Sequence, residues 1–425
     1  MLVGEALNDG KTLYVQLVDD TAPLTAWIFG WVEIIASRSI GGRQVLALIL
    51  IFFQAAFFAI LLINNRAYNE NTYLPALIFG ILSFYSFDLF SFSSELLGST
   101  VLLFALNNLF KEIEFRVQRD ETLLNLGVYL GIASLLVFSY FTFAVGTLLI
   151  LFVFTRMTMQ KTFLLLFGFA LPHLLLISFY FFWDNHMALF QNFYGYNFTF
   201  ITHRVVGMKS ILLLGLVPLT YLIFSLIMLN REAHFTKYQS QLLQVMFLWL
   251  LVAAAEAIIT RKRTPHSFFT FIPPLAYFIS HYLLLIRRKR IAEMMLWIFM
   301  IGIVSMAWAS RTNKIKAIDF SGLFIKNQPA YKQIQNKRIM VLGDPFELYQ
   351  QNKLGGYFLN WELARDIFKN PDYFENIILV DRSFQKDAPE VIVDQNNLMQ
   401  PFFDRIPKWQ LKYKREGNLY FKVSN

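Results

Sequence analysis

Two pairs of acidic residues lie beside strongly apolar segments of the sequence. Asp19 and Asp20 form the first pair, and Asp88 and Glu95 form the second. Carboxylates at the edge of a membrane segment can act as a general base or as ligands of a divalent metal ion. Alternatively, they serve the fold alone, as caps of the helices that follow or as favourable charges in a first helical turn. Asp88 fits this alternative least, because it ends an apolar run.

A basic cluster is the third feature with chemical potential. Arg261, Lys262, Arg263 and His266 directly precede an apolar segment that contains two prolines. A guanidinium group matches the oxygen pair of a phosphate or diphosphate. The cluster therefore predicts a site for a lipid phosphate, and anchoring to lipid headgroups is the alternative interpretation.

The long loop 184–210 adds His203 and Arg204 among many aromatic side chains. We interpret it as a substrate loop on the membrane surface that covers a site, and a plain amphipathic surface loop is the alternative. The spacing of His186 and His203 does not predict a metal site. The chain contains no Cys, which excludes disulfides and thiolate chemistry. It also contains no P-loop, GxGxxG or HExxH motif.

The composition predicts that membrane helices position these residues. Hydrophobic residues make up 56% of the 425 residues, Phe alone accounts for 46, and charged residues for only 16%. One soluble core cannot bury so much apolar surface, which excludes a soluble enzyme, a disordered chain and a fibrous repeat. The net charge of +9 is typical of cytoplasmic loops and of contact with anionic membrane lipid, so we expect no nucleic-acid partner.

Apolar runs of sufficient length predict about ten membrane spans. We divide the run 125–155 into two short helices with a turn near residues 140–143, and Pro172 lies inside another span, where neighbouring groups can satisfy the freed carbonyl. The full set is 44–64, 73–88, 96–110, 125–155 as two spans, 163–183, 211–229, 241–258, 267–285 and 291–308.

The distribution of Lys and Arg favours an orientation with both chain ends outside. The outer loops are then 1–43, 89–95, 184–210 and 259–266, so the basic cluster lies on the side that the positive-inside rule disfavours. No span precedes the first outer loop. Either residues 25–36 insert differently, or a further span lies upstream of Met1, and we expect the second. We expect a bacterial inner membrane protein with its C-terminal domain outside the cytoplasm.

The sequence changes character near residue 310. We predict a transmembrane helical domain over residues 1–309 and a soluble α/β domain over residues 310–425. Apolar runs predict strands at 338–343, 376–381 and 419–423 and a helix at 360–369. The expected fold class is therefore an α-helical polytopic membrane protein with a small extracytoplasmic α/β domain.

Four stretches together resemble the GT-C class of integral membrane glycosyltransferases. Residues 10–24, with Gly10-Lys-Thr-Leu-Tyr14 and the first acidic pair, resemble the first outer loop of that class. Residues 88–95 resemble its second acidic loop, and residues 266–275 resemble its late helix with a His followed by Pro-x-Leu. The polar tail resembles the extracytoplasmic domain that many members carry. The likeness is to mannosyltransferase-like members that use polyprenyl-phosphate sugars.

The resemblance implies a hexosyltransferase that moves a sugar from a polyprenyl-phosphate donor to an acceptor at the outer face of the membrane. It implies that Asp19 or Asp20 activates the acceptor or helps to hold a divalent metal ion. Asp88 and Glu95 complete the acidic side, and the basic cluster holds the lipid phosphate. The class usually places an acidic pair directly after its first span, whereas only Glu5 stands there in this sequence.

Two other function classes compete with a transferase. A non-catalytic membrane scaffold subunit of an envelope or secretion assembly would account for the large polar tail and the absent first span. A transporter would require inverted repeats or charges at mid-membrane, and both acidic pairs lie at the edges of the apolar runs.

Overall fold

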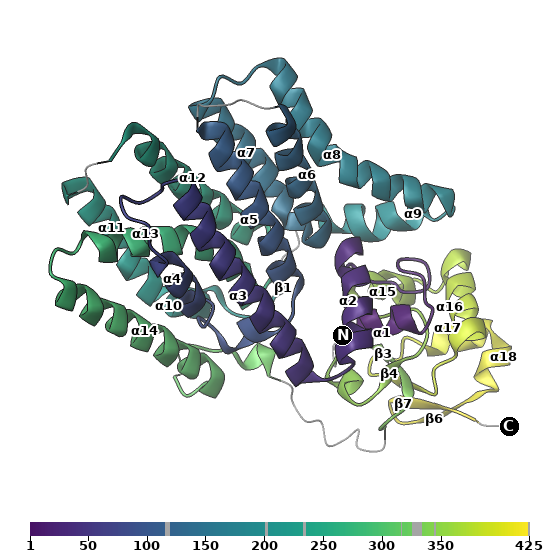
Figure 1. Cartoon of the computed structure of the whole chain (residues 1–425). Helices are drawn as coiled ribbons and strands as arrows, with labels where there is room; N and C mark the ends of the chain where they lie inside the picture. The colour runs from purple at the N-terminus through teal and green to yellow at the C-terminus, as the bar shows by residue number, and fades with distance from the viewer. Residues whose placement is uncertain are drawn as a thin grey trace. The chain divides into compact units, whose positions relative to one another are not determined.

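The computed structural model describes the chain except residues 115–119, 200–202, 233–234, 316, 325–333, 344–345 and 424–425. The side chains of His203, Arg204, Glu232 and Arg263 are likewise not described. The chain is mostly helical and forms two compact units (Figure 1). Residues 39–178 and 200–324 form the helical unit, and residues 1–38, 179–199 and 325–425 form the unit that contains a sheet.

The helical unit contains the long apolar helices, one of which, α8, continues into the second unit. Its helices are α3 (Ile40–Asn64), α4 (Leu74–Leu82), α5 (Ser94–Ile113), α6 (Asp120–Leu136), α7 (Phe141–Phe154), α8 (Met159–Phe182), α10 (Met208–Leu214), α11 (Leu216–Glu232), α12 (Lys237–Ile259), α13 (Ile272–Leu285) and α14 (Lys289–Thr312).

Among the described residues, five helices are long and apolar enough to cross a membrane, namely α3, α5, α8, α12 and α14. The helices α10 and α11 form one further span if the pair, bent by 56°, is counted together. These helices agree with an integral membrane protein, but the expected ten spans are not confirmed. Helix α4 illustrates the reason: its nine residues reach only about 14 Å, against an apolar core of about 30 Å.

The division of the run 125–155 is confirmed. Helix α6 ends at Leu136, a 3₁₀ turn follows at Phe138–Tyr140, and α7 begins at Phe141. Pro172 lies inside α8 as expected.

Glycines let α6 and α8 pack with their backbones in contact. A Cβ added at Gly127 would lie 2.3 Å from the carbonyl oxygen of Leu165, and one at Gly168 would lie 2.4 Å from that of Leu124. Close approach through small residues is a general way to associate helices in a membrane, where burial of apolar surface gives little driving force.

The second unit contains a five-stranded sheet in the order β4-β3-β5-β7-β6. The strand β3 pairs in parallel with β4 and β5, and β7 pairs antiparallel with β5 and β6. The elements of this region are β3 (Arg338–Leu342), β4 (Lys353–Leu354), α15 (Trp361–Lys369), α16 (Phe374–Asp387), β5 (Val391–Asp394), α17 (Gln400–Arg405), α18 (Pro407–Gln410), β6 (Tyr413–Glu416) and β7 (Leu419–Lys422).

The strands predicted at 338–343 and 419–423 and the helix at 360–369 are confirmed. The strand predicted at 376–381 is wrong, because these residues belong to α16. Its buried residues are Val380, Ser383 and Phe384, and this spacing of three and four is that of one helix face. The central strand is instead β5, which is buried at every position.

The start of the chain belongs to the unit with the sheet, a feature that the predicted division at residue 309 did not include. The helices α1 (Leu2–Asn8) and α2 (Pro23–Ala36) pack closely at Gly4, where an added Cβ would lie 2.3 Å from the carbonyl oxygen of Phe29. Residues 179–199, with α9 (His186–Leu189) and the π-helical turn Phe190–Gly195, also belong here.

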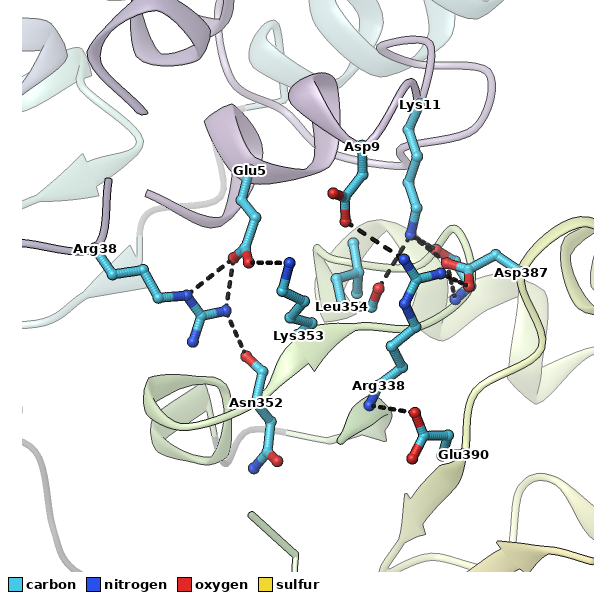
Figure 2. A network of polar contacts seen from close by, with 11 residues as sticks. Glu5, Asp9, Lys11, Arg38, Arg338, Asn352, Lys353, Leu354, Asp387 and Glu390 are labelled. Carbon is cyan, nitrogen blue, oxygen red and sulfur yellow. Dashed lines mark hydrogen bonds and ion pairs between the residues drawn. The ribbon is translucent and has the colours of Figure 1, made fainter. Parts of the chain in front are cut away.

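Ion pairs join the first residues to the sheet (Figure 2). Lys353 Nζ, on β4, lies 3.4 Å from a carboxylate oxygen of Glu5, and Lys11 Nζ lies 2.7 Å from a carboxylate oxygen of Asp387 at the end of α16. Lys11 also donates to the carbonyl oxygens of Leu354 and Gly356. Backbone hydrogen bonds continue this attachment further along the chain, since Val18 donates to the carbonyl of Tyr357 at 2.7 Å.

Candidate functional site

The helical unit brings Asp88 and His266 together. His266 Nε2 lies 2.9 Å from a carboxylate oxygen of Asp88 and 3.2 Å from the hydroxyl of Ser91. Asp88 belongs to the 3₁₀ turn Phe87–Phe90, and His266 to the 3₁₀ turn Pro265–Thr270. Both turns fill short breaks between apolar helices, so their polar side chains meet at one end of the helices.

An aromatic contact fixes the two segments beside this pair. The rings of Tyr85 and Phe268 stack with their centroids 3.9 Å apart. The hydroxyl of Tyr85 donates to the backbone carbonyl of Ile211 at 2.8 Å, which ties helix α10 to the same place. Three segments distant in the sequence are therefore held at the site by one fully buried tyrosine.

The surroundings of His266 favour its charged form. The imidazole is buried, with an exposed fraction of 8%. Burial alone would lower the pKa of His266, but the hydrogen bond to Asp88 and the negative charges of Glu95 and Asp88 outweigh it, so the pKa lies above its ordinary value. A protonated His266 bound to Asp88 through Nε2 retains Nδ1 as a second donor.

Three buried polar atoms near this pair have no hydrogen-bond partner among the described residues: Ser86 Oγ, Thr264 Oγ1 and His266 Nδ1. Buried polar groups are normally satisfied, and each exception requires an explanation. A polar ligand seated between these segments would supply the missing partners.

Glu256 is a further acidic residue of this region that the sequence interpretation missed. It lies in α12 with an exposed fraction of 2%, and Ser139 donates to its Oε1 at 2.6 Å. It interacts electrostatically with Glu95, whose backbone carbonyl accepts a hydrogen bond from Tyr140. The signal was present in the sequence, since one Glu interrupts the apolar run from Ala253 to Ile259.

The segments of the predicted substrate loop and of the basic cluster also come together. Strand β1 (His203–Arg204) pairs in parallel with strand β2 (Lys262–Arg263). This places the two segments side by side as backbones, while the side chains of His203, Arg204 and Arg263 lie outside the described residues. Arg261 is partly buried and Lys262 is exposed.

An apolar cavity of about 430 Å³ adjoins the site within the helical unit. Leu212, Leu219, Leu222, Leu250, Ala254 and Ala257 line its apolar part. Thr264, Pro265 and Ser267, the neighbours of His266 in the sequence, line the cavity as well. The cavity therefore reaches from membrane-type helices to the segment that carries the imidazole.

Asp19 and Asp20 belong to the other compact unit, where both make structural contacts. Asp19 is buried and accepts hydrogen bonds from the backbone and the hydroxyl of Thr21. Asp20 accepts from the side chain of Asn360 at 2.8 Å, and Asn360 in turn caps helix α15. These contacts agree with the alternative interpretation, in which the two residues serve the fold.

The positions of the acidic and histidine side chains do not indicate a metal centre. Among the residues that the structure describes, no three His, Asp or Glu side chains form a group that could hold a metal ion.

Comparisons of the chain with protein families, with curated proteins and with solved structures found no match. The assignment of a function therefore depends on the geometry of the site.

Proposed function

We propose that the protein is a membrane glycosyltransferase that moves a sugar from a polyprenyl-phosphate donor to an acceptor outside the cytoplasm. One observation carries the proposal: the apolar cavity between membrane-type helices adjoins the segment of His266. A polyprenyl phosphate has a long apolar chain, which suits the apolar cavity, and one anionic end, which suits the polar side chains of the adjoining segment. Burial of such a chain is favourable by about 0.8 kcal/mol for each CH₂ group.

The segment 264–267, which adjoins the cavity, carries donors that suit a phosphate group. The unpaired Nδ1 of His266 and the hydroxyl of Thr264 can donate to phosphate oxygens, and the exposed Lys262 adds positive charge nearby. Asp88 acts in this scheme as a positioning residue, because its hydrogen bond to Nε2 fixes the ring and favours the imidazolium. Positioned donors of this kind stabilise the charge that develops on a leaving group.

The reaction then needs one proton acceptor. The acceptor hydroxyl attacks the anomeric carbon, the bond from that carbon to the phosphate oxygen breaks, and the hydroxyl proton passes to a carboxylate. Glu95 is our candidate for this carboxylate, because it is partly exposed and lies close enough to interact electrostatically with His266. Its Oε2 already accepts a hydrogen bond from Ser94 at 3.0 Å, which orients the group.

The cavity can be tested by filling it. Replacement of Ala254 or Ala257 by Phe should reduce photo-crosslinking of a polyprenyl-phosphate probe about tenfold or more, because each side chain lines the cavity. The matched control is Ala255→Phe, at an exposed position of the same helix. Equal crosslinking in all three variants would exclude a lipid chain in this cavity and would favour the scaffold alternative.

A further inference from the structure

A second polar site lies at the opposite end of the helical unit. Helix α12 passes from Gln239 at this end to Glu256 near the candidate transferase site. The 17 helical steps from Gln239 to Glu256 correspond to about 25 Å along a helix, close to the thickness of a membrane core. Helix α12 is long and apolar enough to cross a membrane, and its two ends would then lie near opposite surfaces.

The larger chamber at this end has a volume of about 640 Å³. Two cations, Arg66 and Lys237, line it together with the carboxylate of Glu114. Amide and hydroxyl side chains complete the lining, namely Tyr68, Asn69, Asn71, Thr236, Tyr238, Gln239 and Gln241. Cations combined with amide donors suit a phosphate group.

The smaller chamber has a volume of about 150 Å³ and a different character. Three rings surround the imidazole of His281: Tyr68 at 4.4 Å, Tyr277 at 4.7 Å and Phe235 at 5.5 Å between centroids. The carboxylate of Glu70 also lines this chamber. Aromatic faces beside a carboxylate suit a small organic cation.

His281 supplies an independent sign of a ligand. The residue is buried, with an exposed fraction of 4%, and its Nε2 has no hydrogen-bond partner among the described residues. An imidazole surrounded by aromatic rings is more stable when neutral, because burial disfavours the charged form. One nitrogen of a neutral imidazole is a hydrogen-bond acceptor. If Nε2 is that nitrogen, a ligand N–H group would be its partner.

The two chambers share Tyr68 and Asn69 as lining residues, so they are neighbours. We propose that they form one binding site for a phosphoethanolamine group, with the phosphate beside Arg66 and Lys237 and the ammonium beside Glu70 and His281. The ammonium has N–H donors for His281 Nε2, which a quaternary ammonium lacks. This proposal does not depend on the proposed transferase activity.

The position of the site at the start of α12 favours a membrane lipid as the molecule that carries the phosphoethanolamine group. Lys237 is the first residue of α12, a helix long and apolar enough to cross the membrane. Its first turn therefore lies near the level of the lipid headgroups. A soluble phosphoethanolamine compound has the same recognition chemistry, and the experiment must distinguish the two.

Native mass spectrometry of the full-length protein in detergent can measure the binding. We expect phosphatidylethanolamine to bind more tightly than phosphatidylglycerol, which lacks the ammonium, and than phosphatidylcholine, which lacks its N–H groups. Loss of one charge-assisted contact should weaken binding about tenfold. Lys237→Gln should weaken phosphatidylethanolamine and phosphatidylglycerol alike, whereas Glu70→Gln and His281→Leu should remove the preference between them.

Two exposed residues outside the lining provide matched controls, Arg290→Gln for the cation and Glu121→Gln for the carboxylate. Competition by free O-phosphoethanolamine identifies the soluble compound as a sufficient ligand, and lipid binding without such competition identifies a lipid headgroup site. Both results support the proposal. Equal affinity for the three lipids, or equal binding by site variants and controls with unchanged unfolding temperature, would overturn it.

Discussion

At the scale of single residues, the informative contacts are charged groups held in apolar surroundings. Asp88 and His266 were singled out in the sequence as separate features, and the structure places them 2.9 Å apart. Asp19 and Asp20, the other predicted acidic pair, have structural contacts instead. Sequence patterns could identify acidic residues at the edges of apolar runs, but they could not show which of these residues meet a base.

The Asp88–His266 pair predicts a pH-dependent contribution to stability. The pKa of His266 is raised in the folded chain, so the contribution is fully present below the unfolded pKa of about 6.5 and is lost as pH rises through the folded pKa. Wild type should therefore exceed Asp88→Asn in free energy of unfolding by about 1–3 kcal/mol near pH 6, and by less near pH 9.

Unfolding temperatures of the purified protein at the two pH values measure this difference. Asp120→Asn is the control, since Asp120 is exposed in the first turn of α6. A difference between wild type and Asp88→Asn that does not change with pH would contradict the proposed charge pair.

Glu256 shows a limit of sequence patterns at this scale. The sequence contains Glu256 as one carboxylate in an apolar run, and the run as a whole predicts a membrane span. Its hydrogen bond to Ser139 joins positions 117 residues apart. Such a partner depends on tertiary packing, which the local pattern does not contain.

At the scale of elements, the apolar runs predicted the positions of the helices more accurately than their lengths. The break near residue 140 was predicted from the length of the run and is confirmed. The strand expected at 376–381 is a helix, because a short apolar run fits either structure and the packing of Val380 and Phe384 decides between them. The cavity beside α12 depends on side chains of several helices and had no signature in the sequence.

The contact between α6 and α8 predicts an intolerance of larger side chains. Gly168→Val should destabilise the protein by about 1–3 kcal/mol, because a Cβ at this position would overlap the carbonyl oxygen of Leu124. Gly80→Val is the matched control, since an added Cβ there meets nothing within 4 Å. Thermal unfolding in detergent measures both variants, and equal unfolding temperatures would contradict the close packing of α6 and α8.

At the scale of the whole molecule, composition predicted membrane helices and a C-terminal α/β region, and the structure contains helices long and apolar enough to cross a membrane and a C-terminal sheet with helices. Ten spans are not confirmed: five helices of the described residues, or six with the bent pair, are long and apolar enough to cross a membrane, because apolar content does not distinguish a crossing helix from a short buried one. The sequence also contained no sign that residues 1–38 and 179–199 pack with the C-terminal sheet. Contacts between such distant segments follow from long-range packing.

The absence of Cys allows a direct test of the proposed orientation. A single Cys at Lys422, on strand β7, should react with a membrane-impermeant maleimide in intact cells. A single Cys at the exposed Arg290, at the start of α14, should react only after the membrane is opened. The reverse pattern would place the C-terminal domain in the cytoplasm and would contradict an outward-facing transferase.

The central claim is that the site of His266 transfers a sugar from a polyprenyl phosphate. Its most direct test is transfer of labelled sugar from synthetic polyprenyl-phosphate donors to acceptors in membrane extract, with purified protein in liposomes. We expect transfer by wild type and by Asp120→Asn, and a loss of about 100-fold in His266→Gln. Transfer by His266→Gln at the wild-type rate, or no transfer by wild type from any donor, would contradict the claim.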